Sequence, residues 1–194
     1  MRKISLLLCI LSITIGAKAQ FFGGHWDQGY YYDLNGKKHK GLILWEVGDK
    51  INFKLNKDAD KIKVSSKMLK SFVVKTDSFV VSKSDLLIDD PFLKVVVNNE
   101  MKLFEARNTH MYASGGNFIQ TKNYYGTNAN DVCKLEKKIF VQIMSIIMAD
   151  KQDVVAKIKD KTLRLNELER TIEFYKTGTL PPPPPKPDPN SFLN

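Results

Sequence analysis

The stretch YYYDLNGKKHKGLILW, residues 30–45, decides the fold class of this chain. Two runs rich in aromatic and branched side chains, 30–33 and 41–45, lie on either side of Asn35-Gly36, and such side chains favour strands. Asn-Gly between two runs of this kind indicates a hairpin, because both central residues of a type I′ turn need positive φ. The sequence therefore predicts an antiparallel hairpin with a type I′ turn at Asn35-Gly36.

Similar runs follow one another as far as residue 125. Turn-forming residues at 75–78, 98–99 and 114–117 separate neighbouring runs, and SSKMLK at 65–70 is expected to form one helical turn. About nine or ten short strands at intervals of roughly ten residues are typical of a β meander, a sandwich or a partly closed barrel. The other predicted strands span residues 51–55, 62–64, 72–74, 79–81, 92–97, 101–105, 107–111 and 118–122.

The hydrophobic pattern changes from strand-like to helical near residue 134. Nine of the eleven residues 139–149 are apolar, which predicts a helix buried on both sides, between the sheet and the helices that follow. Asp150 and Asn166 are expected to cap two further helices, and Gly178 to end the last one in the left-handed conformation. The predicted fold is α+β: a mostly antiparallel β-rich region at 20–134, then two or three helices at 135–178 packed on it.

Residues 1–19 have the three parts of a secretory signal peptide. Arg2 and Lys3 precede an apolar run at 4–15, and small residues at 17–19 lie just before Gln20. The run has about 12 residues, against roughly 20 for a membrane span, and Cys9 lies inside it without the small residue that a lipoprotein signal needs. We expect cleavage before Gln20, export to the periplasm or the outside, and no transmembrane span afterwards.

The end of the chain is rich in proline. Seven of the eight prolines lie within residues 181–189. Each proline fixes φ and lacks a backbone donor, so residues 179–194 are predicted to be a disordered, polyproline II-like tail that adds nothing to the fold. Two interpretations of the tail stay open: a docking ligand or spacer, and an end without a partner.

Composition and charge narrow the function classes. Apolar residues make up 43% of the chain, enough for a real core, and two cysteines are too few for a small disulfide scaffold. Loss of Arg2, Lys3 and Lys18 with the signal leaves 27 basic and 21 acidic side chains, a formal charge of +6. This charge favours weak attraction to anionic surfaces. Lysines 37, 38 and 40 form the one tight cluster, which we interpret as a solvated hairpin, with an anion site as the alternative.

Motifs for chemistry are missing. The sequence has no nucleotide-binding glycine motif and no hydrolase G-x-S-x-G elbow, and nothing in it indicates nucleic-acid binding. His25 and Asp27 could both reach a metal, but no third ligand is indicated, so a surface segment is favoured. Cys133 is the one cysteine outside the signal. We predict that it is buried, with intermolecular pairing and a reactive thiol as alternatives.

Two hypotheses about function remain. The first is a non-catalytic binding or structural module of the cell envelope, with an envelope protein or an anionic envelope surface as partner. The alternative is a hydrolase that acts on a glycan or a peptide through dispersed carboxylates. The first is favoured, because no acid, base or nucleophile forms a recognisable site; we predict no catalytic, cofactor-binding or metal-binding residue and no cofactor. The carboxylates of the alternative are Asp27, Asp33, Asp49 and Asp77.

Aromatic residues gather near the first and last predicted hairpins. Exposed tyrosine and tryptophan can stack on sugars or anchor a protein partner, whereas a simple preference for strands would also place them here. The sequence leaves both interpretations open. The residues are Trp26, Tyr30, Tyr31, Tyr32 and Trp45 at the first hairpin, and Tyr112, Tyr124 and Tyr125 at the last.

A resemblance to known proteins rests on five short segments, at 41–43, 48–53, 68–74, 77–80 and 102–105. They resemble uncharacterised exported proteins of Gram-negative bacteria, in which a β-rich region precedes short helices like those expected at 139–175. The resemblance covers about 140 residues. It implies the same architecture here, and it implies no catalytic residue.

Overall fold

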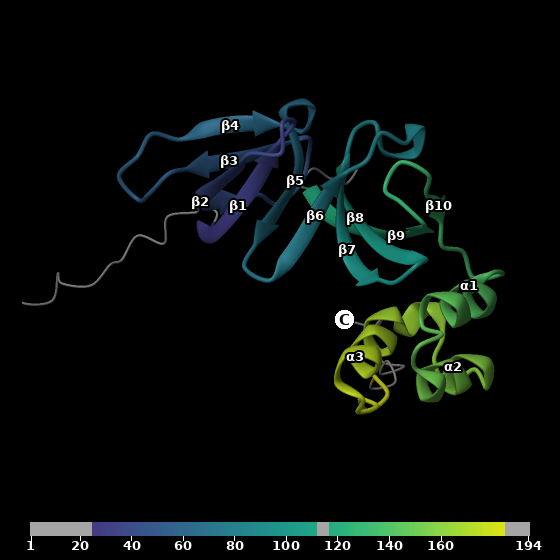
Figure 1. Cartoon of the computed structure of the whole chain (residues 1–194). Helices are drawn as coiled ribbons and strands as arrows, with labels where there is room; N and C mark the ends of the chain where they lie inside the picture. The colour runs from purple at the N-terminus through teal and green to yellow at the C-terminus, as the bar shows by residue number, and fades with distance from the viewer. Residues whose placement is uncertain (1–24, 112–116, 185–194) are drawn as a thin grey trace, which may run out of the picture.

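The computed structural model describes residues 25–111 and 117–184. The described chain forms one antiparallel sheet of ten strands, followed by three α-helices (Figure 1). This confirms the predicted α+β fold. The signal at 1–19, the cleavage site before Gln20, Tyr112 and residues 185–194 lie outside the described residues, as does most of the expected turn at 114–117.

The strands are short except for two. In space their order is β10-β9-β8-β7-β6-β5-β1-β2-β3-β4, so only β5 departs from a meander: it pairs with β1 and not with β4. A 3-10 turn at Ser66–Met68 makes this crossing and confirms the expected helical turn. The strands are β1 Asp27–Asp33, β2 Lys38–Leu44, β3 Lys50–Lys54, β4 Ile62–Ser65, β5 Leu69–Val74, β6 Asp77–Val81, β7 Phe92–Asn98, β8 Lys102–Met111, β9 Asn117–Gly126 and β10 Cys133–Lys134.

The first five strands curl around an aromatic core (Figure 1). Phe72 stacks on Phe79 with ring centroids 4.6 Å apart, and Trp45 meets both rings edge-on. The curl needs glycine where β1 and β2 cross this core. A Cβ on Gly41 would lie 2.2 Å from the carbonyl oxygen of Lys54, and one on Gly29 2.3 Å from that of Val73.

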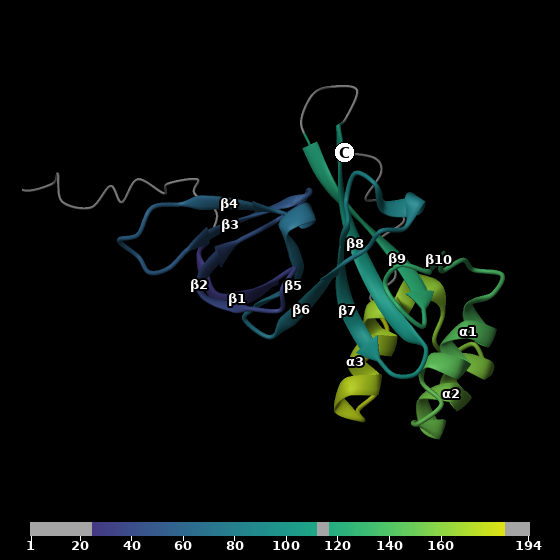
Figure 2. The ribbon, with the colours of Figure 1, turned by 45° about the horizontal axis from the view of Figure 1, so that its top comes forward.

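The three helices pack at the other end of the sheet, beside the turn between β7 and β8 (Figure 2). They are α1 Phe140–Ile147, α2 Gln152–Lys159 and α3 Leu168–Thr177. The Asn99 side-chain nitrogen fixes this contact, since three acceptors lie within hydrogen-bond distance of it: the carbonyl oxygen of Ile147 (2.7 Å), Asp150 Oδ1 (2.9 Å) and the Tyr175 hydroxyl (3.0 Å). In the described part of the chain, no helix is long and apolar enough to cross a membrane.

The first hairpin is present, but its turn differs from the predicted type I′. Only Gly36 has positive φ, at 82°, and Asn35 does not. The Asp33 carboxylate accepts the backbone N–H groups of Asn35 and Lys37, both at 2.9 Å, and its carbonyl oxygen accepts that of Gly36. Side-chain bonding of this kind stabilises a turn with a single left-handed residue. The hairpin of β5 and β6 is tighter than expected, with Lys75 and Thr76 alone between the two strands.

The prediction that residues 139–149 are buried on both sides was wrong. One face of α1 packs into the helical core, while Val141 is 38% and Ile146 48% exposed. The two predicted side-chain caps were wrong as well. Asp150 accepts hydrogen bonds from Asn99 and from the Tyr175 hydroxyl (2.8 Å), and Asn166 lies within a 3-10 turn. Neither α2 nor α3 has a side-chain cap.

Gly178 ends α3 with φ 72°, which confirms the predicted left-handed stop. The chain then runs back along α3. Leu180 packs against the helical core, and the Pro181 carbonyl oxygen accepts a hydrogen bond from Arg170 Nε (2.7 Å). The start of the proline-rich segment therefore belongs to the fold, contrary to the expectation that everything from 179 onward adds nothing to it.

Candidate functional site

One face of the sheet carries lysine and tyrosine side chains over β1 to β4. Residues paired across antiparallel strands, and residues two apart along a strand, point to the same face. The register pairs Tyr30 with Lys40, Tyr32 with Lys38, and Asn52 with Lys63. Leu42, two residues after Lys40, pairs with Lys54. The lysine–tyrosine face consists of Tyr30, Tyr32, Lys38, Lys40, Lys50, Lys54 and Lys63.

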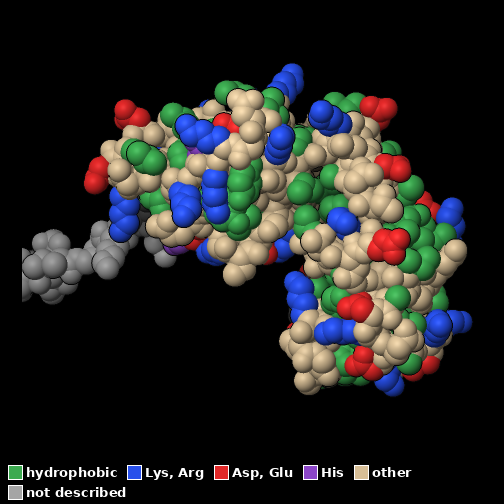
Figure 3. All heavy atoms as spheres, in the orientation of Figure 1, with side chains coloured by type: hydrophobic (Ala, Val, Ile, Leu, Met, Phe, Trp, Pro, Cys, Tyr) green, Lys and Arg blue, Asp and Glu red, His purple; other side chains and the backbone are tan. Residues whose placement is uncertain are grey.

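Acidic residues are missing from this face. In the described strands β1 to β6, the positions that share it hold no Asp or Glu. Figure 3 shows basic side chains recurring over the surface of the first strands. Five lysines on three neighbouring strands therefore form a positive surface with tyrosine beside it.

Two of these lysines lie over aromatic rings. Lys38 Nζ is 3.5 Å from the centre of the Tyr30 ring and 5.7 Å from that of Tyr32. Lys54 Nζ is 5.3 Å from the centre of the Trp26 ring. The electron-rich face of an aromatic ring attracts an ammonium group. The rings therefore hold these two charges in place at the surface.

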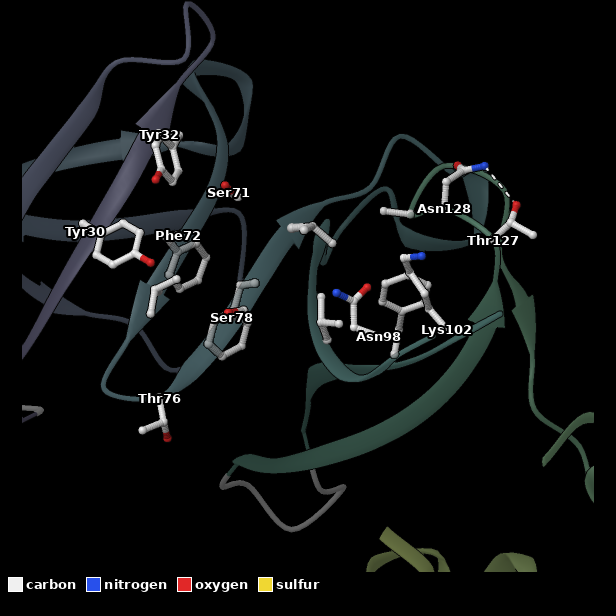
Figure 4. Close-up of a pocket in the computed structure, with 16 residues that line it drawn as sticks. Tyr30, Tyr32, Ser71, Phe72, Thr76, Ser78, Asn98, Lys102, Thr127 and Asn128 are labelled. Carbon is white, nitrogen blue, oxygen red and sulfur yellow. Dashed lines mark hydrogen bonds between the residues drawn. The ribbon is translucent and has the colours of Figure 1, made fainter. Parts of the chain in front are cut away.

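The same face continues into a groove of about 620 Å³ (Figure 4). One wall belongs to β1, β5, β6 and the turn before β6; the other belongs to the β7–β8 hairpin and the segment that follows β9. Every polar side chain in the lining is neutral except that of Lys102, whose Nζ donates to the carbonyl oxygen of Asn99. The polar side chains are Tyr30, Tyr32, Ser71, Thr76, Ser78, Asn98, Lys102, Thr127 and Asn128.

Hydrogen bonds fix the segment after β9, which forms part of the second wall of the groove. The Ser82 hydroxyl donates to the carbonyl oxygen of Ala129 at 2.6 Å, and Asn130 Oδ1 accepts the backbone N–H of Lys83 at 2.9 Å. Asn128 Oδ1 accepts the backbone N–H groups of Asn130 and Asp131. The groove is thus part of the folded structure, and it presents hydroxyl and amide groups to a ligand.

The aromatic residues that are close in sequence lie in two different environments in the structure, the lysine–tyrosine face and the core. Tyr30 and Tyr32 lie on the lysine–tyrosine face, with ring centroids 5.7 Å apart. Tyr31 points the other way into the core, where burial and the neighbouring Asp33 raise the pKa of its hydroxyl. Trp45 also packs in the core. At the other hairpin Tyr124 is buried, and burial raises the pKa of Tyr125.

The four aspartates of the hydrolase hypothesis do not meet in the groove. Asp33 binds His39 Nε2 at 3.0 Å, and this bond together with the turn N–H groups lowers the pKa of its carboxyl. Asp77 is paired with Lys94 at 2.8 Å, and the Asp49 carbonyl oxygen accepts the N–H of Ser66. None of the four lines the groove.

Asp27 lies near His25, the other candidate metal ligand. Its carboxylate is 2.7 Å from His25 Nδ1 and 3.1 Å from Lys75 Nζ. Partial burial raises the pKa of the Asp27 carboxyl, but the hydrogen bonds and charges of Lys75 and His25 outweigh it and lower the pKa overall. Within residues 25–111 and 117–184 no group of three or more histidine, cysteine or acidic side chains could hold a metal ion.

Cys133 is exposed, and the prediction that it is buried was wrong. It lies on the edge strand β10 opposite Tyr125, while its neighbours Val132 and Leu135 are buried. An edge strand has one partner only, so residues next to buried positions can still reach solvent. Apolar neighbours in sequence therefore do not place a side chain in the core.

Comparison of the chain with protein-family models, with curated proteins and with solved structures found no match.

Proposed function

We propose that this protein is an exported, non-catalytic binding module whose lysine–tyrosine face binds an anionic polymer of the cell envelope. The observation that carries the proposal is the shared register of Lys38, Lys40, Lys50, Lys54 and Lys63, which places five positive charges on a face without acidic strand residues. The export signal in the sequence supports a partner outside the cytoplasm.

Spacing on the face suits a ligand with repeated charges. Neighbouring strands are about 4.8 Å apart and alternate residues about 6.8 Å apart along a strand, so the lysines form a two-dimensional array. One exposed ion pair contributes little, roughly 0–1 kcal/mol. A polymer that meets several lysines at once gains from all of them, because later contacts form within the same complex.

The groove beside the face supports an acidic glycan as the anionic polymer. Hydroxyl and amide side chains such as Ser71, Ser78 and Asn98 can exchange hydrogen bonds with sugar hydroxyls. The Tyr32 ring offers an aromatic surface of the kind on which sugars stack. An acidic glycan would use both parts, with its carboxylates or phosphates on the lysines and its sugar rings along the groove.

A matched pair of variants tests the proposal. The first, Lys40→Gln/Lys50→Gln/Lys63→Gln, removes three exposed charges from the face. The control, Lys83→Gln/Lys134→Gln/Lys159→Gln, removes three exposed charges elsewhere and has the same net charge. Binding to immobilised polygalacturonate is measured at low salt, with neutral dextran as the uncharged polymer.

We expect the chain that starts at Gln20 to bind polygalacturonate and not dextran, and to release it as the salt concentration rises. The face variant should lose most of this binding, and the control variant should keep most of it. Equal losses in the two variants would mean that net charge, and not this face, controls the binding.

A further inference from the structure

A second groove, of about 890 Å³, lies in the helical region where the start of α1 meets the connection between α2 and α3. It is separate from the lysine–tyrosine face and shares no residue with it. Its floor is apolar: Phe140, Ile158 and Leu163 are buried, Leu165 is half-buried, and Val141 is exposed. An exposed valine over buried apolar side chains is a surface that an apolar ligand can cover.

Three exposed cations surround this floor: Lys137, Lys161 and Arg164. No carboxylate lines the groove, and Asn166 is its one neutral polar side chain. Arg164 uses Nε to donate to the carbonyl oxygen of Lys161 at 3.0 Å. The groove therefore combines an apolar floor with three positive charges, one just before α1 and two in the connection between α2 and α3.

Nearby acidic residues do not neutralise these three charges, because each is paired with another cation. Glu136 lies 3.1 Å from Lys138, Asp160 3.6 Å from Lys157, and Glu167 2.9 Å from Arg170. In the described part of the chain, Lys137, Lys161 and Arg164 have no ion pair.

The loop that carries two of the three cations is held in place. Lys161 has φ 64°, a conformation that non-glycine residues adopt rarely. The Leu163 N–H donates to the carbonyl oxygen of Lys157 (2.9 Å), and the Thr162 N–H donates to Asp160 Oδ1 (2.8 Å). Small-molecule sites are usually formed in advance in this way and span about 300–1,000 Å³.

We propose that this groove binds a free amphiphile made of one acyl chain that ends in an anionic group. The methylenes would cover Val141 and the buried floor, and the anion would lie against Arg164 with Lys137 and Lys161 beside it. The planar guanidinium suits a carboxylate or phosphate through two parallel hydrogen bonds. A peptide fits less well, because its backbone needs polar partners and the lining offers only Asn166 as a neutral one.

Calorimetric titration of the full chain that starts at Gln20 tests the apolar floor and the cations separately. Dodecanoate has both an acyl chain and an anionic group, 1-dodecanol has the chain alone, and acetate has the anionic group alone. We expect saturable binding of one dodecanoate per chain, weaker binding of dodecanol and none of acetate. Val141→Glu places an anion on the floor and should weaken dodecanoate binding about tenfold or more. The control is Ile146→Glu, since Ile146 lies on the same helix, is also exposed (48%, against 38% for Val141) and does not line the groove.

The charge is tested separately. Arg164→Gln should weaken dodecanoate but leave dodecanol unchanged, and Lys159→Gln, outside the groove, should change neither. Thermal unfolding confirms that each variant is folded.

Three results would contradict the proposal: no saturable binding, equal effects of Val141→Glu and Ile146→Glu, or binding that appears only after residues 185–194 are removed. The last would assign the groove to the chain's own end. Loss of dodecanoate binding in Lys40→Gln/Lys50→Gln/Lys63→Gln, with Arg164→Gln unaffected, would place the ligand on the lysine–tyrosine face and would also overturn it. Failure of polygalacturonate binding alone leaves this inference standing, because the two sites share no residue.

Discussion

Replacing Asn99 with Ala is expected to weaken the contact between the sheet and the helices. The side-chain nitrogen of Asn99 lies within 3.0 Å of three acceptors: the Ile147 carbonyl oxygen, Asp150 Oδ1 and the Tyr175 hydroxyl. An amide nitrogen has two hydrogens, so two of these bonds form at a time. The turn between β7 and β8 is thereby joined to α1, to α3 and to the segment before α2.

The size of the effect follows from those bonds. Each contributes a net free energy of roughly 0.5–1.5 kcal/mol, so Asn99→Ala should destabilise the protein by about 2 kcal/mol. For a domain of this size that loss lowers Tm by roughly 4–8 °C. Asn98→Ala is the matched control. Asn98 is the exposed neighbour of Asn99, so its replacement should change stability by less than about 0.5 kcal/mol.

Urea unfolding followed by circular dichroism measures both variants, with Tyr175→Phe and the double variant completing a mutant cycle. The Tyr175 hydroxyl accepts from Asn99 and donates to Asp150 at 2.8 Å, so the two substitutions should be coupled by about 0.5–1 kcal/mol. If Asn99→Ala and Asn98→Ala unfold at the same urea concentration, this contact does not hold the helices to the sheet.

The remaining predictions concern exposure, pH and the chain end. Cys133 should react with a bulky maleimide in the native protein nearly as fast as after unfolding, and slow labelling would contradict its exposed position. The His39 hydrogen bond and the turn N–H groups lower the pKa of Asp33, so their stabilising effect is present above the ordinary Asp value of about 3.9 and is lost as the pH falls through the lower folded value. Asp33→Asn keeps the turn acceptor but removes this titration, so its stability should fall less than that of the wild type between about pH 5 and 2 in acid unfolding monitored by circular dichroism; parallel curves would refute the assignment. A chain that ends at Gly178 should melt a few degrees below one that ends at Pro184, because it loses the half-buried Leu180 and the bond from Arg170 to Pro181, together worth about 1–2 kcal/mol. Equal melting temperatures in differential scanning calorimetry would restore the view that the segment from residue 179 adds nothing.

Features set by neighbours in sequence could be predicted. The runs of branched and aromatic residues, the turn residues between them and Gly178 depend on local chemistry, and the structure has most of the strands, the hairpins and the left-handed stop where the sequence indicates them. The predicted strands 101–105 and 107–111 are instead one continuous strand, β8, and β10 was not predicted. The change from strands to helices near residue 134 is local in the same sense. Alternation along a strand also indicated that many lysines face solvent.

Features that depend on residues far apart in the sequence could not be predicted. The pairing of β5 with β1 brings together residues 36 to 45 positions apart, from Asp33 with Leu69 to Gly29 with Val74, and no local pattern encodes it. Asp150 has the chemistry of a helix cap, yet the Asn99 and Tyr175 side chains compete for it from other elements. Val141 and Ile146 are as hydrophobic as their buried neighbours, and only the number of elements packed around α1 decides which face stays open.

The candidate site shows the same division. Tyr30 and Tyr32 belong to the aromatic residues that the sequence groups at the first hairpin, but their position beside five lysines depends on the register of four strands. Trp45 carries the same chemical signal and lies in the core, because the curl of the first five strands closes over it. Apart from Lys102, the groove is made of uncharged side chains from both halves of the sheet, which have no recognisable spacing in the sequence.

Chemical-shift mapping tests the central claim most directly. The labelled chain that starts at Gln20 is titrated with a short oligomer of galacturonic acid at low salt. We predict that the shifted amides cluster on β1 to β4 at the lysine–tyrosine face and along the adjoining groove, while the helices do not respond. Shifts spread over all exposed lysines, or confined to the helices, would contradict the account.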